Sequence, residues 1–267
     1  MQKIIVFTDL HYLPEGDGIV GLDPGARFAQ GLAHALENHP DAARIVITGD
    51  IAHNAAPAEY DRFRRAVADC PLPVSLTVGN HDRRAPFRAA FPGAPVTAAG
   101  HVQDIVDIGA DTRLVLLDTL NEDAEDTHSG LLCEARLAWL DRALETAGAR
   151  RVIVFSHHPP FLTGFGGMDW IGLKNRGELA SRLRAHGNVV QIVSGHVHRT
   201  IQGSAGGIPA AIFKSTCHQM PMALGYRDPR LSVDEPGAYG LLLLTDDGVI
   251  VHTEDFTLPQ HDTAIYD

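Results

Sequence analysis

The stretch "VGNHDRR" at residues 78–84 closes an apolar run with an asparagine, a histidine and an aspartate. These three side chains bind metal ions or exchange protons, whereas a chain usually turns with plainer residues such as glycine, proline or serine. The stretch therefore marks a strand end at which we expect chemistry, and it directs attention to the ends of the other strands.

Similar short, β-branched runs recur along the chain, and helical patterns lie between them. The runs span residues 3–9, 44–50, 74–82, 151–158 and 188–198. Apolar residues spaced by three and four, from Tyr60 to Cys70 and from Cys133 to Ala147, form stripes that predict helices packed on a sheet. The alternation is typical of βαβ units. The length fits one large α/β domain over residues 1–267.

Other regions depart from this rhythm. Residues 102–118 and 208–256 hold further strand-like runs, which we expect to form antiparallel strands of a second sheet. The glycine-rich segment 161–175 and the proline-rich, charged segment 219–238 are expected to be long loops. The first of these contains Trp170 and other large apolar residues, so it either forms a lid over a site or packs against a protein surface.

Composition limits the class of partner. The formal net charge of −11 argues against nucleic acid polymers and anionic membrane surfaces as partners. The cysteines, Cys70, Cys133 and Cys217, are far apart and suggest neither a disulfide framework nor a thiolate zinc site. No segment resembles a signal peptide or a membrane span. We therefore expect a soluble, cytoplasmic protein.

Each of the alternating runs ends in polar residues that can bind metals. The clusters are Asp9 and His11; Gly49 and Asp50; Asn80, His81 and Asp82; His157 and His158; and His196 and His198. Ligands of open α/β sheets bind outside the carboxyl ends of the strands, so the clusters should converge. Carboxylate, imidazole and amide oxygen suit Mn, Fe, Zn or Co. Any single histidine here is also compatible with a plain structural role, but five apolar strands that all end in ligands favour a metal site.

The order of these motifs resembles that of the binuclear metallophosphoesterases, the calcineurin-like superfamily. The motifs are D-x-H at residues 9–11, GD at 49–50, GNHD at 79–82, HH at 157–158 and GHxH at 195–198. The segments "GDIAHNAAPAEYDRF", "SHHPPF" and "STCHQMP" further resemble class III cyclic nucleotide phosphodiesterases and bacterial glycerophosphodiesterases. The resemblance implies a four-layer α/β/β/α sandwich of two mixed β-sheets flanked by helices.

The resemblance also implies roles for individual residues. One transition-metal ion would be held by Asp9, His11, Asp50 and His198, and a second by Asp50, Asn80, His157 and His196. Asp50 would bridge the two ions, which are divalent or trivalent Mn, Fe, Zn or Co. His81 would face the substrate phosphate, and His218 would lie in the substrate pocket.

Several other residues near the motifs are expected to have supporting rather than metal-binding roles. We expect His53 to be a rim residue and His158 to pack or donate a hydrogen bond rather than bind metal. Cys217 is interpreted as a small buried residue. The arginines at positions 83, 84 and 88 either assist an anionic substrate or form a solvated face.

The chemistry expected of this site is phosphodiester hydrolysis. Two metal ions activate a bridging hydroxide, which attacks phosphorus, while His81 stabilises the phosphate oxygens or protonates the leaving alkoxide. Small diesters are favoured as substrates, 3′,5′-cAMP first and glycerophosphodiesters or a broad range of phosphoesters second. The alternative of another class is a non-catalytic metal-binding scaffold. The resemblance also implies a homodimer or larger homo-oligomer.

Overall fold

The apolar runs form strands and the apolar stripes form helices in a computed structural model of the chain, which describes residues 1–258. The tail at residues 259–267 lies outside the described residues. The elements are β1 (Gln2–Phe7), α1 (Pro24–Asn38), β2 (Arg44–Ile47), α2 (Pro57–Ala66), β3 (Val74–Leu76), α3 (Arg84–Ala90), β4 (Asp104–Ile108), β5 (Thr112–Leu117), α4 (Glu134–Glu145), β6 (Arg151–Ser156), α5 (Gly166–Trp170), α6 (Arg176–His186), β7 (Val189–Ser194), β8 (Ile201–Ala205), β9 (Ile208–Ile212), β10 (Tyr239–Thr245) and β11 (Gly248–Glu254).

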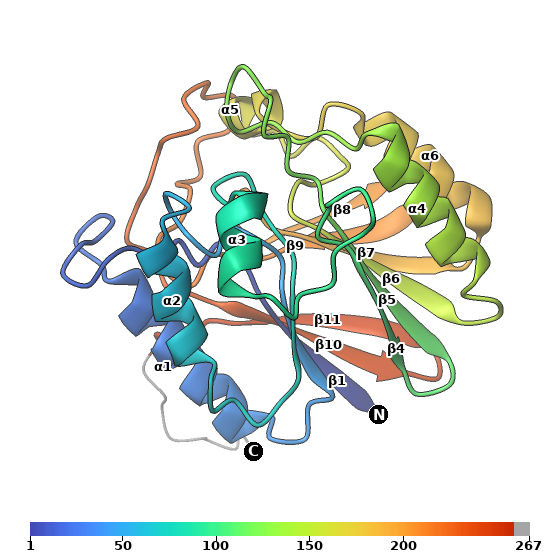
Figure 1. Cartoon of the computed structure of the whole chain (residues 1–267), viewed down its shortest axis with the longest axis horizontal. Coiled ribbons are helices and arrows are strands. Elements are labelled where there is room, and N and C mark those ends of the chain that lie inside the picture. The colour runs from blue at the N-terminus through green and yellow to red at the C-terminus, as the bar shows by residue number, and fades with distance from the viewer. Residues whose placement is uncertain (259–267) are drawn as a thin grey trace, which may run out of the picture.

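The strands form two mixed sheets that face each other, with helices on the outer faces (Figure 1). One sheet has the strand order β11-β10-β1-β2-β3, and the other has the order β4-β5-β6-β7-β9-β8. Side chains such as Ile4, Val46, Leu116 and Phe155 form the core between the sheets. The expected four-layer α/β/β/α sandwich is confirmed.

The outer layers have cores of their own. The helices α1 and α2 pack on the first sheet, where Phe28 and Phe63 meet Phe7 of β1. On the far side, α4 and α6 cover the second sheet with Leu140 and Leu183. The apolar stripes expected around residues 60–70 and 133–147 thus lie in α2 and α4 and the turns that follow them. Each stripe is buried because it is the face that meets a sheet.

The expected antiparallel strands of a second sheet are confirmed only in part, because β4 pairs antiparallel with β5 there but β10 and β11 belong to the first sheet. Residues 102–118 supply β4 and β5, but β5 pairs in parallel with β6. The region 208–256 is divided, because β9 joins β7 while β10 inserts antiparallel beside β1 in the first sheet. All six residues of β5 are buried, as expected for an inner strand covered on both faces. The local sequence pattern of an inner strand does not determine which strands pair with it in the sheet.

The parallel strands deliver the motif loops to one edge of the molecule. In the first sheet β1 pairs in parallel with β2, and in the second β6 pairs in parallel with β7. The carboxyl ends of parallel strands lie on the same side of a sheet, so the loops after these strands lie together. Within residues 1–258, no helix has the length and apolar character needed to cross a membrane.

Candidate metal centre

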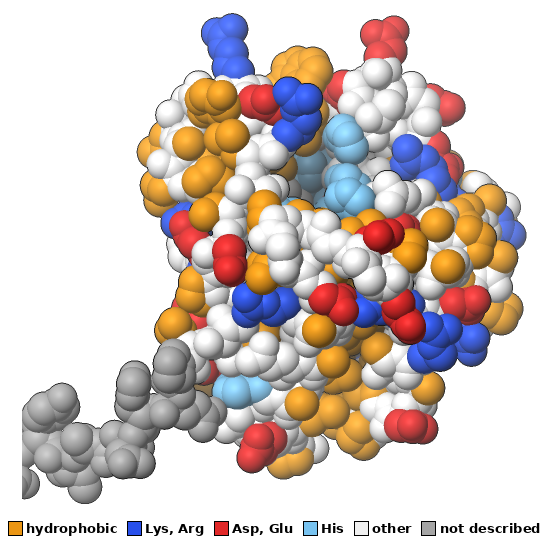
Figure 2. All heavy atoms as spheres, turned by 90° about the vertical axis from the view of Figure 1, so that its left-hand side faces the viewer, with side chains coloured by type: hydrophobic (Ala, Val, Ile, Leu, Met, Phe, Trp, Pro, Cys, Tyr) orange, Lys and Arg blue, Asp and Glu red, His pale blue; other side chains and the backbone are white. Residues whose placement is uncertain are grey.

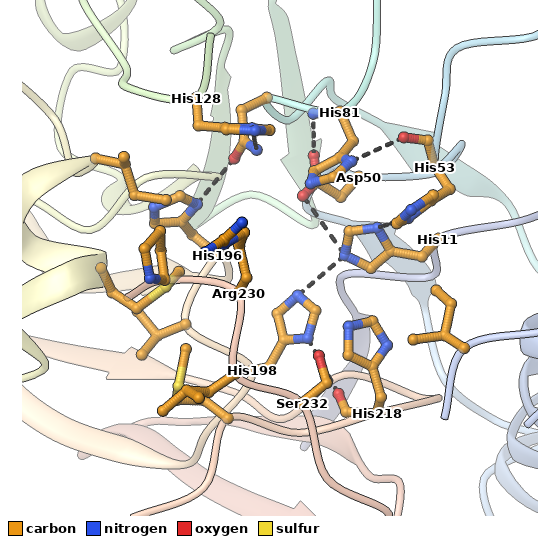
Figure 3. Close-up of a pocket in the computed structure, with 18 residues that line it drawn as sticks. His11, Asp50, His53, His81, His128, His196, His198, His218, Arg230 and Ser232 are labelled. Carbon is orange, nitrogen blue, oxygen red and sulfur yellow. Dashed lines mark hydrogen bonds and ion pairs between the residues drawn. The ribbon is translucent and has the colours of Figure 1, made fainter. Parts of the chain in front are cut away.

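The motif side chains come together where the two sheets meet, as Figure 3 shows for most of them. Asp9 and His11 follow β1, Asp50 follows β2, and Asn80 and His81 follow β3 in the first sheet. The second sheet contributes the remaining set, which is His157 directly after β6 and His196 and His198 after β7. The expected convergence of the clusters is therefore what the structure shows.

The backbone at these positions adopts an unusual conformation. Asp9, His11, Asp50, His196 and His198 all have positive φ angles, between 50° and 71°. Non-glycine residues rarely occupy this left-handed region, and when they do the strain is concentrated at functional sites. The fold thus holds these particular side chains in place at a conformational cost.

Two glycines in the motifs allow the loops to approach closely. A Cβ atom on Gly79 would lie 2.2 Å from Oδ1 of Asp50, and one on Gly195 would lie 2.7 Å from Oδ2 of Asp9. Both distances are shorter than any real contact. The glycines of GNHD and GHxH are therefore needed, because the Asp50 carboxylate occupies the space of a side chain at Gly79, and the Thr8 hydroxyl and the Asp9 carboxylate occupy it at Gly195.

The first group of ligand candidates consists of Asp9, His11, Asp50 and His198. Their ligand atoms all lie within 4.8 Å of one another. Nε2 of His11 is 3.0 Å from Nε2 of His198, which in turn is 3.3 Å from Oδ1 of Asp9. The Thr8 hydroxyl and the backbone N–H of His196 donate to the Asp9 carboxylate and fix its direction.

The second group is centred on the amide oxygen of Asn80. Oδ1 of Asn80 lies 2.9 Å from Nε2 of His157 and 2.8 Å from Nδ1 of His196. Asp50 connects this group to the first, because its Oδ2 lies 3.4 Å from Nε2 of His157 and 3.6 Å from Nε2 of His11. One carboxylate oxygen therefore faces both groups of ligand atoms.

Hydrogen bonds at the outer ring nitrogens orient the imidazoles. Nδ1 of His157 donates to the backbone oxygen of Thr48 at 3.0 Å, and Nδ1 of His198 donates to that of His218 at 3.0 Å. Each bond fixes the tautomer and leaves Nε2, with its lone pair, directed into the centre. This is the usual arrangement of histidines that bind metals.

The donor set fits two transition-metal ions. Nδ1 of His196 faces Oδ1 of Asn80 at 2.8 Å, whereas Nε2, on the far side of the ring, is buried and has no hydrogen-bond partner among residues 1–258. Imidazole nitrogens together with carboxylate and amide oxygens are the ligands expected for Mn, Fe, Zn or Co. The three cysteines are free and none belongs to the clusters of ligand atoms, so thiolates play no part there.

Burial and neighbouring charges set the proton affinities in the centre. Burial, with the charge of His81, lowers the pKa of His11 well below its ordinary value. Burial also lowers the pKa of His196 well below the ordinary range. Burial alone would lower the pKa of His157, but the carboxylates of Asp50 and Asp9 raise it to about 9. Carboxylates that stabilise an imidazolium here also stabilise a bound cation.

His81 lies beside the carboxylate that faces both groups. Its backbone N–H donates to Oδ1 of Asp50 at 2.8 Å, and its Nδ1 donates to the backbone oxygen of His53 at 2.7 Å. The ring stacks on the imidazole of His53 and makes a tilted contact with that of His128, with centroid distances of 5.0 Å in both pairs. Nε2 of His81 is thus the ring nitrogen left for contact with a ligand in the pocket.

Two further residues, which had no predicted role, shape the centre. His128 accepts a hydrogen bond at Nδ1 from the Asn80 amide at 2.9 Å, which turns Oδ1 of Asn80 towards the imidazoles of the second group. Asp82 accepts from the backbone N–H groups of Ile51, Ala52 and Gly79 and from the Tyr60 hydroxyl. No motif marked His128, whereas Asp82 stood in GNHD without an assigned role.

The remaining histidines of the motifs take supporting positions. His158 uses both ring nitrogens, at 2.8 Å from the Thr119 hydroxyl and 2.9 Å from the His128 backbone oxygen, in agreement with the expected hydrogen-bonding role. His218 packs against His198 with ring centroids 4.6 Å apart and lines the pocket, as expected. His53 also lines the pocket, where its Nδ1 lies 3.2 Å from Nδ1 of His11.

The arginines after GNHD do not face the pocket. Arg84 donates to Asp118 at 2.7 Å and to Glu122 at 2.8 Å, and Arg83 donates to backbone oxygens of its own loop. Neither expectation for Arg84 holds, because it is a structural ion-pair residue rather than a substrate contact or a solvated face. Cys217 is buried, as expected.

A cavity of about 340 Å³ opens beside the centre. Figure 2 shows imidazoles at the bottom of a hollow in one face of the molecule. His11, Asp50, Asn80 and His81 line its floor, and its sides include residues of the segments 161–175 and 219–238. The expectation of a long loop over 161–175 was wrong in part, because the short helix α5 forms within it. The volume lies within the range of small-molecule pockets.

Comparison with known proteins agrees with this geometry. The sequence model of the calcineurin-like phosphoesterase family matches residues 2–200 of this chain. The chain therefore belongs to this family. A probable cyclic nucleotide phosphodiesterase of Rhodopseudomonas palustris is 39% identical and covers 96% of this chain and 93% of that protein. A 3′,5′-cyclic adenosine monophosphate phosphodiesterase of Pseudomonas aeruginosa is 32% identical over 92% of this chain and 86% of its own length.

Two more distant proteins extend the comparison. A glycerophosphodiester phosphodiesterase of Enterobacter lignolyticus is 28% identical and covers 80% of this chain and 77% of that protein. A dimetal phosphatase from Danio rerio shares the fold with a TM-score of 0.74, at 16% identity and with 96% of each chain covered. The chain is therefore a metal-dependent phosphoester hydrolase, and the alternative of a non-catalytic scaffold is not supported.

Proposed function

We propose that the protein is a dinuclear-metal phosphodiesterase that hydrolyses small diesters, with cyclic nucleotides of the 3′,5′-cAMP type as the preferred class. The observation that carries the proposal is Oδ2 of Asp50, which faces the ligand atoms of both groups at 3.4 Å and 3.6 Å. The substrate class is supported by the two cyclic nucleotide phosphodiesterases at 39% and 32% identity.

In this proposal the centre consists of two overlapping ligand sets. Asp9, His11 and His198 hold one ion, Asn80, His157 and His196 hold the other, and Asp50 serves both. When bound, two such ions supply an activated water and neutralise the charge of the phosphate. The hydrogen bonds from His157 to Thr48 and from His198 to His218 keep the ligand nitrogens directed inward.

His81 is proposed to act on the substrate itself. Its Nδ1 is committed to the His53 backbone oxygen at 2.7 Å, so contact with the phosphate falls to Nε2. As a cation, the ring donates from Nε2 to a phosphate oxygen or to the leaving alkoxide. Water adds to phosphorus, the ester bond breaks, and the departing oxygen takes up a proton.

A second candidate substrate class is glycerophosphodiesters, because the Enterobacter lignolyticus relative carries that name. The two classes share the phosphodiester bond and differ in the alcohol attached to it. In this proposal the metal centre and His81 contact only the phosphodiester group, which both substrate classes contain. Discrimination must therefore come from the sides of the pocket.

The proposal is tested by activity against a panel of diesters with the metals varied separately. Chelator-treated protein is loaded with Mn, Fe, Zn or Co and assayed with 3′,5′-cAMP, glycerophosphoethanolamine and bis(p-nitrophenyl) phosphate. We expect the highest kcat/KM with cAMP. Absence of turnover of every diester with all four metals would refute the proposal.

Two variants separate the roles of metal ligand and proton donor. Asp50→Ala should lose the metal ions and the activity together. His81→Ala should keep close to two metal ions per chain in elemental analysis and lose roughly 10²–10⁴-fold in kcat, the range for a positioned proton donor. Unchanged kcat in the His81 variant would remove this role from His81.

A further inference from the structure

The pocket beside the metal centre has two chemically different halves. One half consists of imidazoles, a carboxylate and an amide, as described above. The opposite half is mainly apolar and is formed by Met168, Ile171, Val197, Met220 and Leu231, which we call the apolar wall. In Figure 3 sulfur-containing side chains lie across the pocket from His11 and His53.

The apolar wall is joined directly to the metal centre. Val197 stands between His196 and His198 in sequence and is buried in the same apolar cluster as Met168 and Met220. The backbone N–H of Met220 donates to the backbone oxygen of His198 at 3.3 Å. A group that reaches beyond a phosphate bound at the centre therefore meets this wall.

The wall is built from two segments that are far apart in sequence and fixed to each other. The N–H of Gly167 donates to the Tyr226 oxygen at 2.8 Å, and that of Gly225 donates to the Gly164 oxygen at 3.0 Å. A Cβ atom on Gly167 would lie 2.8 Å from the backbone oxygen of Arg227. The segments 161–175 and 219–238 thus present a preformed surface, which lowers the ordering cost of binding.

The chemistry of the wall selects for a flat, weakly polar substituent. Thioethers of methionine make favourable contacts with aromatic rings, and two of the wall residues are methionines. Arg230 also lines the pocket, and its guanidinium, a group that stacks on aromatic faces, is exposed and donates to the Asp228 carboxylate at 2.9 Å and 2.8 Å. The hydroxyl groups of a glycerol substituent would find few partners along these side chains, and unpaired polar groups are costly.

We propose that Met168, Met220 and Leu231 form a subsite for the nucleobase, which selects cyclic nucleotides over glycerophosphodiesters. The inference rests on the proposed phosphodiesterase function and assigns its specificity to particular side chains. Leu231 is the best position to test, because it is only half-buried and its replacement perturbs the apolar cluster least.

The test compares Met220→Ala and Leu231→Ala with Met222→Ala. Met222 lies two residues from Met220 in the same loop but is 66% exposed and does not line the pocket. The first two variants should lose roughly tenfold or more in kcat/KM for cAMP, the scale for contacts in an apolar pocket. They should change less than about twofold with glycerophosphoethanolamine, and Met222→Ala should match wild type with both substrates.

Equal losses with both substrates, or no loss with either, would overturn the subsite while leaving the phosphodiesterase function intact. Binding assays judge the subsite without turnover, by calorimetric titration with 5′-AMP and with glycerol 3-phosphate. Weaker binding of 5′-AMP alone in Leu231→Ala supports the subsite even if no diester is hydrolysed. Identical binding of 5′-AMP by the wild type and Leu231→Ala contradicts it.

Discussion

Asn80 depends on His128 for the direction of its amide. The amide nitrogen donates to Nδ1 of His128 at 2.9 Å, which leaves the oxygen facing His157 and His196. Without that partner the amide is free to rotate and to present its nitrogen, which cannot bind a metal. An asparagine can therefore offer its oxygen to a metal ion only if a neighbouring group fixes the direction of its amide.

We predict that His128→Ala weakens binding of the second metal equivalent by roughly 10–100-fold, the usual effect of losing a group that orients a ligand. His128→Asn keeps a carbonyl acceptor at this position and should retain most of the affinity. Titration of metal into chelator-treated protein measures both. Full affinity in the alanine variant would show that Asn80 is oriented by other contacts.

The candidate ligands could be predicted from the sequence because each stands in a short motif directly after an apolar run. His128 could not be predicted in this way, since it is a single histidine in a polar stretch. Its place depends on the loop after β5, which Arg84 and Arg136 hold through the backbone oxygen of Leu120. Such contacts between distant segments leave no local pattern.

At the scale of elements, Asp82 ties together the loops after β2 and β3. One carboxylate accepts three backbone N–H groups from these loops and the hydroxyl of Tyr60 in α2. All of these donors are buried, so removal of the carboxylate leaves them without partners. The two loops carry Asp50, Asn80 and His81, and Asp82 fixes their relative position together with the hydrogen bond from the His81 N–H to Asp50.

We expect Asp82→Ala to lower the free energy of unfolding by roughly 3 kcal/mol or more, because several buried donors lose their acceptor. Asp61→Ala is the matched control, since Asp61 pairs only with Arg64 on the exposed surface of α2. Urea unfolding of metal-free protein measures the difference. Equal midpoints for the two variants would contradict the role given to Asp82.

The same carboxylate gives a pH dependence. Burial, together with the charge of Asp50, raises the pKa of Asp82 to about 6, above the value of about 3.9 for an unfolded chain. The stabilisation by Asp82 is then complete below pH ~4 and declines as the pH rises towards 6. The stability difference between wild type and Asp82→Ala in metal-free protein should therefore be larger at pH 4 than at pH 7.

The elements also show where sequence patterns fail. Helices and strands were predictable because period and burial agree in segments such as α4 and β6. The pairing of β10 with β1 was not, because any apolar strand of suitable length satisfies the same pattern. The pairing is determined by packing in the core between the sheets, where Ile4 of β1 and Leu242 of β10 lie on one side.

At the scale of the whole molecule, the candidate metal centre lies between the two sheets, and its candidate ligands come from both. Asp9 and Asp50 come from the first sheet, and His157 and His198 from the second. Bound ions would therefore add to the apolar contacts and the hydrogen bonds, such as that from His157 to Thr48, that connect the two sheets. Ligands gathered from both sheets exist as a site only in the folded protein.

Removal of metal should consequently lower the thermal stability. Binding to the folded state alone adds about 2.7 kcal/mol at a free metal concentration 100 times Kd, which corresponds to a rise in Tm of roughly 5–10 °C for a chain of this size. Scanning calorimetry of chelator-treated and reloaded protein measures the shift. Asp50→Ala should show little of it, and a full shift in that variant would place the stabilising ions elsewhere.

The separation of Asp9 from His198 along the chain has a consequence for biosynthesis. A nascent polypeptide emerges with its amino-terminal end first and folds in that order, so the early ligands leave the ribosome well before their partners. The first ligand group stays incomplete until β7 and the turn after it have been released. The complete first group of candidate ligands is therefore available to an ion only after translation has passed His198.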